Sequence, residues 1–317
     1  MNFTALLTII ATLFLLMACG FFARKKGIID DVASKRLSTL IIKIGQPMMI
    51  ISALTEAEFS YENLADGFLY IGLGMIFHAV MGVFAFLLCK GFRDLDERKI
   101  TEFSLMFVNG GFIGFPILEA LFGAKGLFLA AFFNISFHLF IWSWGIAILA
   151  RGRSDIKLTV KKIFINLGSV PCLIGILIYM LAIPLPGFAL PAFLSKFFMY
   201  LSNLCTPISV LITGALLATR TPRQIFGSGK IYYFSAMKLL ALPLVVCIIG
   251  KLISLPHNMI LFITVEAALP AASSITMFSE MYGLNSGYAS QTVGTSSLLS
   301  VGTLPLVLLA AEWIASI

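Results

Sequence analysis

Two groups of polar and helix-breaking residues interrupt apolar stretches of the chain. The first group contains Asn109, Gly110, Gly111 and Pro116. Glycine permits unusual backbone dihedrals, and proline removes one N–H and clashes with the preceding turn, so these residues predict a broken helix. Backbone groups freed by such a break hold solutes in many transporters, and the start of a half-helix attracts negative charge. The pattern therefore predicts that Asn109 and its neighbours bind an anionic group.

The second group occupies the corresponding place in the other half of the chain. Here Pro270 and Ala271 are expected to shape the break, while Ser273 and Ser274 supply hydroxyl groups. This stretch has no asparagine, so the two halves would offer unequal ligands. A simpler interpretation is also open, in which Asn109 makes an interhelical hydrogen bond and the small residues only allow close helix packing.

Two ionisable residues, Lys238 and Glu266, lie inside apolar stretches. Lys238 is about eight residues into its stretch, or roughly 12 Å deep at the rise of an α-helix. An ammonium group there must be paired or hydrated, so Lys238 either attracts a carboxylate substrate, balances Glu266 or extends back to the membrane surface. Glu266 lies one helical turn before Pro270. Burial favours its neutral form, which makes it a candidate proton carrier, and an ion pair with Lys238 is the alternative.

The elements that position these residues are predicted to be membrane-spanning helices. The chain has 317 residues, of which 59% are hydrophobic and 12% charged, against about 25% charged in a soluble domain. Its mean hydropathy is +1.00. Ten apolar segments have about the length that spans a bilayer as a helix. They cover residues 3–22, 37–54, 68–89, 103–122, 126–150, 163–183, 197–218, 231–249, 259–281 and 287–311.

The net charge of +7 reflects topology rather than a nucleic-acid partner. In a ten-span arrangement, 17 of the 22 Lys and Arg residues fall in loops on one side, and Glu56, Glu58 and Glu62 fall on the other. An excess of basic residues marks the cytoplasmic side, so both termini are predicted to be non-cytoplasmic. The basic loop residues are Arg24, Lys25, Lys26, Lys35, Arg36, Lys90, Arg93, Arg98, Lys99, Arg151, Arg153, Lys157, Lys161, Lys162, Arg220, Arg223 and Lys230.

The sequence also predicts two copies of one five-helix unit, in residues 1–150 and 163–317. A constant offset between the two halves places Pro47 on Pro207, Gly123 on Gly283, and the break at Gly110 on the break at Pro270. Because five is an odd number, the second copy enters the membrane inverted, as in many secondary transporters. The short polar linker between the copies leaves no room for a soluble domain, which argues against a membrane sensor.

Other chemistries find little support in the sequence. The five cysteines form no Cys-x-x-Cys pair and the three histidines are scattered, so neither a metal site nor a prosthetic cofactor is expected. The sequence contains no nucleophile motif of an intramembrane enzyme. Thr292, Thr295, Ser296, Ser300 and Thr303 form a polar stripe at helical spacing, which either lines a cavity or sodium site or joins neighbouring helices.

The order and spacing of several motifs resemble the auxin efflux carrier family, and more closely its prokaryotic members, some of which are regarded as malate permeases. The resemblance runs nearly end to end. It rests on residues 20–29, 109–116, 203–207, 238–243 and 269–272 and on the Ser/Thr-rich last segment, which ends in Thr303-Leu304-Pro305. The long hydrophilic loop that plant members often carry after the fifth helix is absent, which puts auxin itself in doubt.

The resemblance implies an all-helical membrane protein of ten helices in two inverted five-helix repeats. The first, second, sixth and seventh helices would form a scaffold that dimerises, and the others a mobile transport domain. The broken fourth and ninth helices would cross near the bilayer midplane. We therefore expect a secondary transporter of small organic anions such as malate in the cell (inner) membrane. Coupling to protons is indicated by Glu266, and sodium coupling and electrogenic uniport are the alternatives. The alternatives are a sodium-coupled organic-anion symporter of the bile-acid type, which also has ten helices and a crossover, and a non-transporting membrane sensor.

Overall fold

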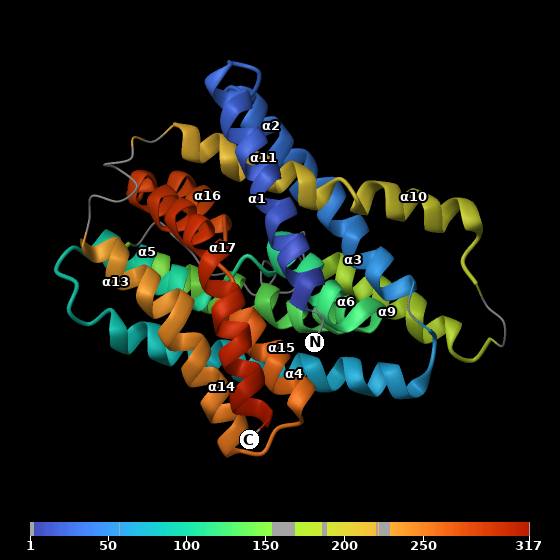
Figure 1. Ribbon diagram of the computed structural model, residues 1–317. Coiled ribbons are helices and arrows are strands. Elements are labelled where there is room, and N and C mark those ends of the chain that lie inside the picture. The colour runs from blue at the N-terminus through green and yellow to red at the C-terminus, as the bar shows by residue number, and fades with distance from the viewer. Residues whose placement is uncertain are drawn as a thin grey trace.

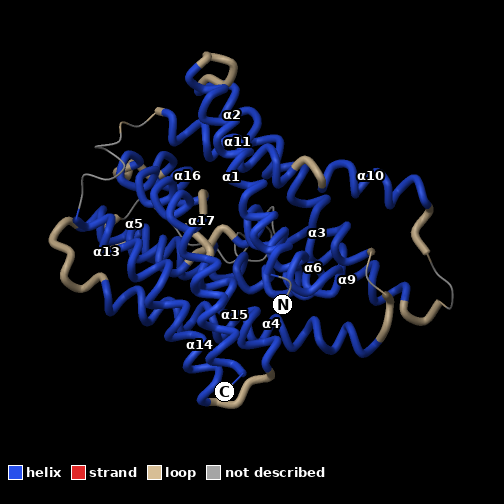
Figure 2. Tube along the Cα trace, in the orientation of Figure 1, coloured by secondary structure: helices blue, strands red, loops and turns tan. Residues whose placement is uncertain are grey.

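The computed structural model describes residues 3–56, 58–153, 169–185, 189–219, 221 and 229–316. Within these ranges the chain is helical and contains no strand (Figure 2). Two apolar helices, Val170–Ala182 and His257–Ala268, are shorter than a full span. In the described part of the chain, six stretches are long and apolar enough to cross a membrane: Asp31–Thr55, Tyr61–Leu88, Gly110–Ala150, Ala192–Ala218, Gly229–Leu252 and Ser286–Ser316.

The structure thus has the helices of a multi-pass membrane protein, while the ten-span, inverted-repeat arrangement remains a prediction. Part of the predicted sixth segment (163–183) and most of the linker at 151–162 lie outside the described residues. The elements of the first half are α1 (Phe3–Lys25), α2 (Asp31–Leu40), the π-helical turn η1 (Ile41–Gly45), α3 (Gln46–Thr55), α4 (Tyr61–Leu88), α5 (Leu95–Met106), η2 (Gly110–Gly114), α6 (Phe115–Phe140), η3 (Ile141–Gly145) and α7 (Ile146–Ala150).

The second half repeats much of this order. Its elements are α9 (Ser169–Ala182), α10 (Ala192–Ser202), α11 (Cys205–Ala218), α13 (Gly229–Ala236), η4 (Met237–Ala241), α14 (Leu242–Leu252), α15 (His257–Ala268), α16 (Ser274–Met281) and α17 (Ser286–Ser316). Gly123 and Gly283, which match between the two halves, both adopt the left-handed conformation that favours glycine, with φ of 68° and 61°. Each of them lies at the turn between a half-helix and the long helical segment that follows.

The helices pack in two groups (Figure 1). In one group α1 lies along α11, and α3 contacts α9 and α10. In the other group α4 packs on α5 and α6, while α14, α15, α16 and α17 pack on one another. The largest apolar core joins α4, α5, α6 and α15, with Phe103, Phe132 and Phe262 among its buried side chains. Contacts between the groups run mainly through α6 and α17.

Glycine brings α1 and α11 into backbone contact. A Cβ atom built on Gly20 would lie 2.0 Å from the Leu211 carbonyl oxygen. A Cβ atom on Gly214 would lie 1.9 Å from the Met17 carbonyl oxygen. Both distances are far shorter than any real contact, so only glycine fits at these two positions. Small residues at helix interfaces let backbones approach in this way in membrane proteins.

Candidate functional site

The first predicted break is a short extended segment between α5 and η2. Phe107 has an extended backbone, with φ of −106° and ψ of 130°, and Asn109 departs from helical geometry with ψ of 56°. Helix resumes at Gly110, and Pro116 lies at the start of α6, directly after the π-helical turn η2. The interruption therefore comes just before the glycines.

The second break separates α15 from α16, and it pairs directly with the first. Val108 and Ala271 form an isolated antiparallel bridge. The Asn109 N–H donates to the Pro270 carbonyl oxygen at 2.9 Å, and the Ala272 N–H donates to the Phe107 carbonyl oxygen at 3.1 Å. Two segments from opposite halves of the chain thus provide hydrogen-bond partners for each other's backbone N–H and carbonyl groups. Such pairing matters inside an apolar core, where unpaired polar groups are costly.

Several backbone donors at this crossing have no partner. Among the described residues, none accepts a hydrogen bond from the N–H groups of Gly110, Gly111 and Phe112, or from those of Ser273 and Ser274. The Ser274 hydroxyl is also buried without a partner. These groups lie in the first turns of two half-helices, where the helix dipole is positive. The crossing is therefore a cluster of free donors.

The carbonyl groups at the crossing are better satisfied. The Phe107 and Pro270 carbonyls are paired across the bridge. Lys238, which is fully buried, donates from Nζ to the Leu105 carbonyl oxygen at 2.9 Å. The ammonium group therefore caps the C-terminal end of α5, where the helix dipole is negative. Extension to the membrane surface, one of the three predicted roles of Lys238, is wrong because the side chain has no exposed area.

Glu266 approaches the start of η2 rather than pairing with Lys238. Its charge interacts with that of Lys238 at a distance, yet within the described chain no ion pair of 4 Å or less joins them. A Cβ atom on Gly110 would lie 3.2 Å from Glu266 Oε2, so the carboxyl group lies beside the first turn of η2. Glu266 is 3% exposed and Asn109 is 6% exposed. Neither side chain has a hydrogen-bond partner among the described residues.

The glycines of the first break allow the side chains of α15 and the second break to pack closely, and they do not adopt unusual backbone dihedrals. Positive φ occurs at Gly123 and Gly283 but not at Gly110, Gly111 or Gly114. A Cβ atom on Gly114 would lie 2.6 Å from Leu269 Cδ1, inside contact distance. The expectation that these glycines supply special backbone angles was wrong, because η2 is helical from its first residue. Their small size lets the two breaks meet.

Sequence reasoning missed Gln46, the first residue of α3. A Cβ atom on Gly111 would lie 3.3 Å from Gln46 Nε2, so the amide lies against the crossing from the other group of helices. Gln46 is half-buried. The sequence contained an indication of this position. Gly45-Gln46-Pro47 interrupts the predicted apolar segment 37–54 at the place that matches the α10–α11 break in the second half.

The polar stripe of α17 mainly joins helices. Ser296 Oγ accepts a hydrogen bond from the Ala271 N–H at 3.2 Å and thereby steadies the second break. Thr292 Oγ1 lies 3.4 Å from Ser104 Oγ of α5, and the Tyr288 hydroxyl lies 2.9 Å from Thr101 Oγ1. Thr292, Ser296 and Ser300 also bond to carbonyls of their own helix. These contacts fix α5 and the second break against α17.

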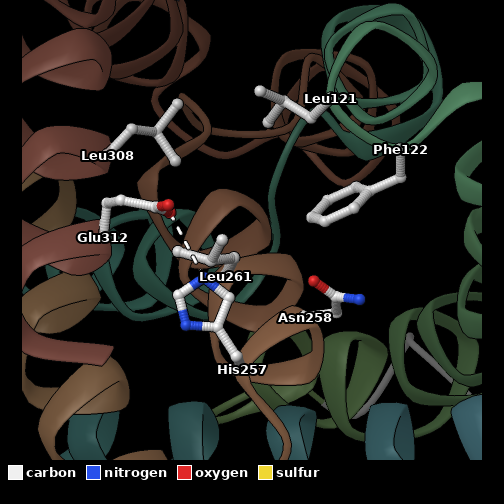
Figure 3. Close-up of a pocket in the computed structure, with 7 residues that line it drawn as sticks. All are labelled: Leu121, Phe122, His257, Asn258, Leu261, Leu308 and Glu312. Carbon is white, nitrogen blue, oxygen red and sulfur yellow. Dashed lines mark ion pairs between the residues drawn. The ribbon is translucent and has the colours of Figure 1, made fainter. Parts of the chain in front are cut away.

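A small cavity lies at the far end of α15 (Figure 3). Its volume is about 120 Å³. His257 Nε2 and Glu312 Oε2 are 3.4 Å apart in it, and both side chains are more than a third exposed. His257 begins α15, whereas the break follows the last residue of that helix, Ala268. The length of this helix separates the two ends by roughly 17 Å, so the cavity is distinct from the crossing.

Comparison with known protein families agrees with this architecture. The family model described as membrane transport protein matches the chain twice, over residues 5–165 and over residues 156–308. The chain belongs to this membrane transport protein family. The resemblance to auxin efflux carriers that the motifs indicated is thereby confirmed. Two successive matches also fit the repeat of helical elements along the chain.

Curated relatives extend over almost the whole chain. An uncharacterized transporter of Methanothermobacter thermautotrophicus is 22% identical over 299 residues, which are 94% of this chain and 95% of the relative. One of Methanocaldococcus jannaschii is 26% identical over 290 residues, covering 87% of this chain and 89% of the relative. The uncharacterized transporter YfdV of Escherichia coli is 21% identical, covering 94% and 93%. The family and its helices identify a membrane transporter.

Proposed function

We propose that this transporter carries small organic anions, such as malate or other carboxylates, and binds them where the two helix breaks meet. The free N–H groups at Gly110–Phe112 and at Ser273 and Ser274 carry the proposal. Several carbonyl groups beside them are already paired, so the crossing offers donors rather than acceptors. Donors at the starts of two half-helices favour a carboxylate. The Asn109 amide, which has no partner among the described residues, completes the set.

The side chains beside the crossing have distinct roles in this proposal. Asn109 donates from its amide to the substrate carboxylate, and the serine hydroxyls donate from the opposite break. Gly110, Gly111, Pro116, Pro270 and Ala271 shape the space. Lys238 supplies positive charge near the end of α5, where its ammonium group donates to the Leu105 carbonyl oxygen. Gln46 faces the crossing from the other helix group and joins the list of lining residues.

Glu266 links substrate binding to protons. Its carboxyl group lies beside the first turn of η2, which is also where the anion binds in this proposal. The negative charges of an ionised Glu266 and of a bound anion beside it would repel strongly, because the effective dielectric constant of a buried site is low. The anion therefore binds best when Glu266 carries a proton, and the two cross the membrane together.

Sodium coupling of the bile-acid type is the second candidate and has less support. Sodium ions bind to oxygen ligands, and broken membrane helices supply them from unwound carbonyls. The Phe107 and Pro270 carbonyls at this crossing are occupied by the bridge, and Leu105 accepts from Lys238. Two of the α17 hydroxyls that could bind sodium, those of Ser296 and Thr292, already contact the second break and Ser104 of α5.

The two helix groups suggest how the site is exposed to each side. The group of α4–α7 and α13–α17 carries both breaks and moves as a transport domain in an elevator-type cycle. The group of α1–α3 and α9–α11 is a scaffold that dimerises in the cell inner membrane. Basic loops place both termini on the non-cytoplasmic side. The proposed transport domain contains both paired breaks, so their bridge is kept during the movement.

Substitution of Asn109 by alanine is expected to reduce malate uptake about tenfold or more. A hydrogen bond to a charged group contributes about 1.5–3 kcal/mol, which corresponds to about a 10- to 100-fold change in affinity. The measurement is uptake of radiolabelled malate into proteoliposomes under an imposed pH gradient, sodium gradient or membrane potential. Asn258→Ala, which removes an exposed asparagine from the start of α15, is the matched control. Uptake that survives Asn109→Ala would contradict the proposed site, and folded protein without malate uptake would exclude malate.

A further inference from the structure

Helix α4 has a row of exposed apolar side chains that ends at a basic cluster. Leu69, Ile76 and Val83 recur at a regular heptad spacing and are 51%, 65% and 51% exposed. Phe86, near the end of the helix, is 40% exposed. Exposed apolar residues at this density on one helix of a membrane protein face acyl chains. The level at which the row ends is therefore the level of the lipid headgroups.

Three cations surround the Phe86 ring. Lys90 Nζ lies 5.4 Å from the ring centroid, and the guanidinium carbons of Arg98 and Arg151 lie 5.7 Å and 6.0 Å from it. They come from the end of α4, from α5 and from the end of α7, so the fold brings them together. Cations at this range are attracted by the face of an aromatic ring, but they also repel one another. Binding of an anion at such a cluster would reduce this repulsion.

The acidic residues near this cluster already have partners. Arg151 makes two hydrogen bonds to the buried Glu102, at 2.8 Å and 2.9 Å, which raise the pKa of the Arg151 guanidinium above its ordinary value. Lys230 pairs with Glu97. Two further contacts involve the nearby aspartates: Asp96 pairs with Lys99 at 3.6 Å, and Asp94 caps the start of α5.

The remaining cations have no counter-charge. Within the described chain, Lys90, Arg93 and Arg98 form no ion pair of 4 Å or less. The Arg98 Nε atom is buried and has no hydrogen-bond partner. A buried guanidinium N–H of Arg98 without a partner, beside the uncompensated ammonium group of Lys90, is a hydrogen-bond donor site for phosphate oxygens.

We propose that Lys90 and Arg98, together with the Phe86 ring, bind the phosphate headgroup of an anionic phospholipid whose acyl chains lie along α4. The position of the cluster at the end of an acyl-facing surface favours a lipid over a soluble anion. Anionic lipids attract basic residues that lie beside a membrane span. The basic loop residues put this site on the cytoplasmic leaflet. The site is separate from the helix crossing and does not depend on which solute is carried.

Native mass spectrometry of the purified transporter titrated with phosphatidylglycerol or phosphatidylcholine tests this site. Each basic residue near an anionic membrane contributes about a fivefold factor in affinity, so Lys90→Gln with Arg98→Gln is expected to weaken phosphatidylglycerol binding about tenfold or more. The control is Lys35→Gln with Arg36→Gln, an equal loss of charge from exposed positions on α2. We expect the control and the wild-type protein to bind phosphatidylglycerol equally, and both to prefer it to phosphatidylcholine.

Three results would overturn the proposal. They are phosphatidylglycerol binding that is unchanged in the α4–α5 double variant, an equal loss in the α2 control, and displacement of the lipid by millimolar inorganic phosphate, which would indicate a soluble-anion site. Thermal unfolding in phosphatidylcholine nanodiscs checks that the double variant is folded. If it is not, the single variant Lys90→Gln replaces it, because Lys90 is exposed and makes no ion pair in the described structure.

Discussion

Replacement of Gly214 by leucine is expected to destabilise the protein by about 3 kcal/mol or more, enough to prevent recovery of folded transporter. Even a single Cβ atom at this position would collide with the Met17 carbonyl oxygen of α1. Backbone atoms have no alternative rotamer, so the two helices must separate and lose their backbone contact. Overpacking in a rigid core typically costs about 1–3 kcal/mol, and a clash with backbone lies at or above that range.

The measurement is thermal unfolding in detergent, followed by intrinsic tryptophan fluorescence. Gly302→Leu on α17 is the matched control, because no atom lies within 4 Å of a Cβ atom built there. We expect the control to unfold near the wild-type temperature. Equal stability of Gly214→Leu and wild type would mean that α1 and α11 are not in backbone contact.

Substitution of Glu266 by glutamine is expected to abolish the response of malate uptake to a pH gradient. Glutamine keeps the size of the side chain and resembles the protonated, neutral form. In the proposed cycle the wild-type carboxyl group must gain a proton before the anion binds beside η2. The variant is always neutral, so malate still binds and moves down its own gradient, but an imposed proton gradient no longer drives its accumulation.

Uptake into proteoliposomes with an acidic exterior, compared with uptake at equal pH, measures this response. Glu119→Gln serves as control because Glu119 lies on α6 with an exposed side chain. It should retain the wild-type response to the gradient. Full pH-driven accumulation by Glu266→Gln would remove Glu266 as the proton carrier and leave the binding site itself standing.

The positions of the two breaks were predictable from the sequence, but the residues that pair across them were not. Asn109-Gly110-Gly111 and Pro270 break the helical pattern locally, and local chemistry is visible in a single sequence. The bridge between Val108 and Ala271 joins residues far apart along the chain and depends on how every helix between them packs. The constant offset between matching residues of the two halves, and the crossing implied by the family resemblance, indicated that the breaks are related.

Side-chain directions were the least predictable feature of the site. The sequence leaves an ion pair between Lys238 and Glu266 open, because both are charged and deep in apolar segments. The structure instead directs Lys238 to a free carbonyl at the end of α5 and Glu266 towards the start of η2. Each charge thus lies near the helix end of opposite partial charge. Such choices depend on where helices end in space, as does the position of Gln46.

Protection of a cysteine at the crossing by substrate tests the central claim most directly. Ser273→Cys would be made in a Cys19→Ala background, since Cys19 is exposed and the other four native cysteines are buried. The rate of modification by a small methanethiosulfonate reagent is then measured on purified protein with increasing malate, with Asn258→Cys at the distant cavity as control. We predict that malate slows modification of Cys at position 273 in a saturable way and leaves position 258 unaffected. Saturable malate transport with no protection at position 273 would contradict an anion site at the crossing of the two broken helices.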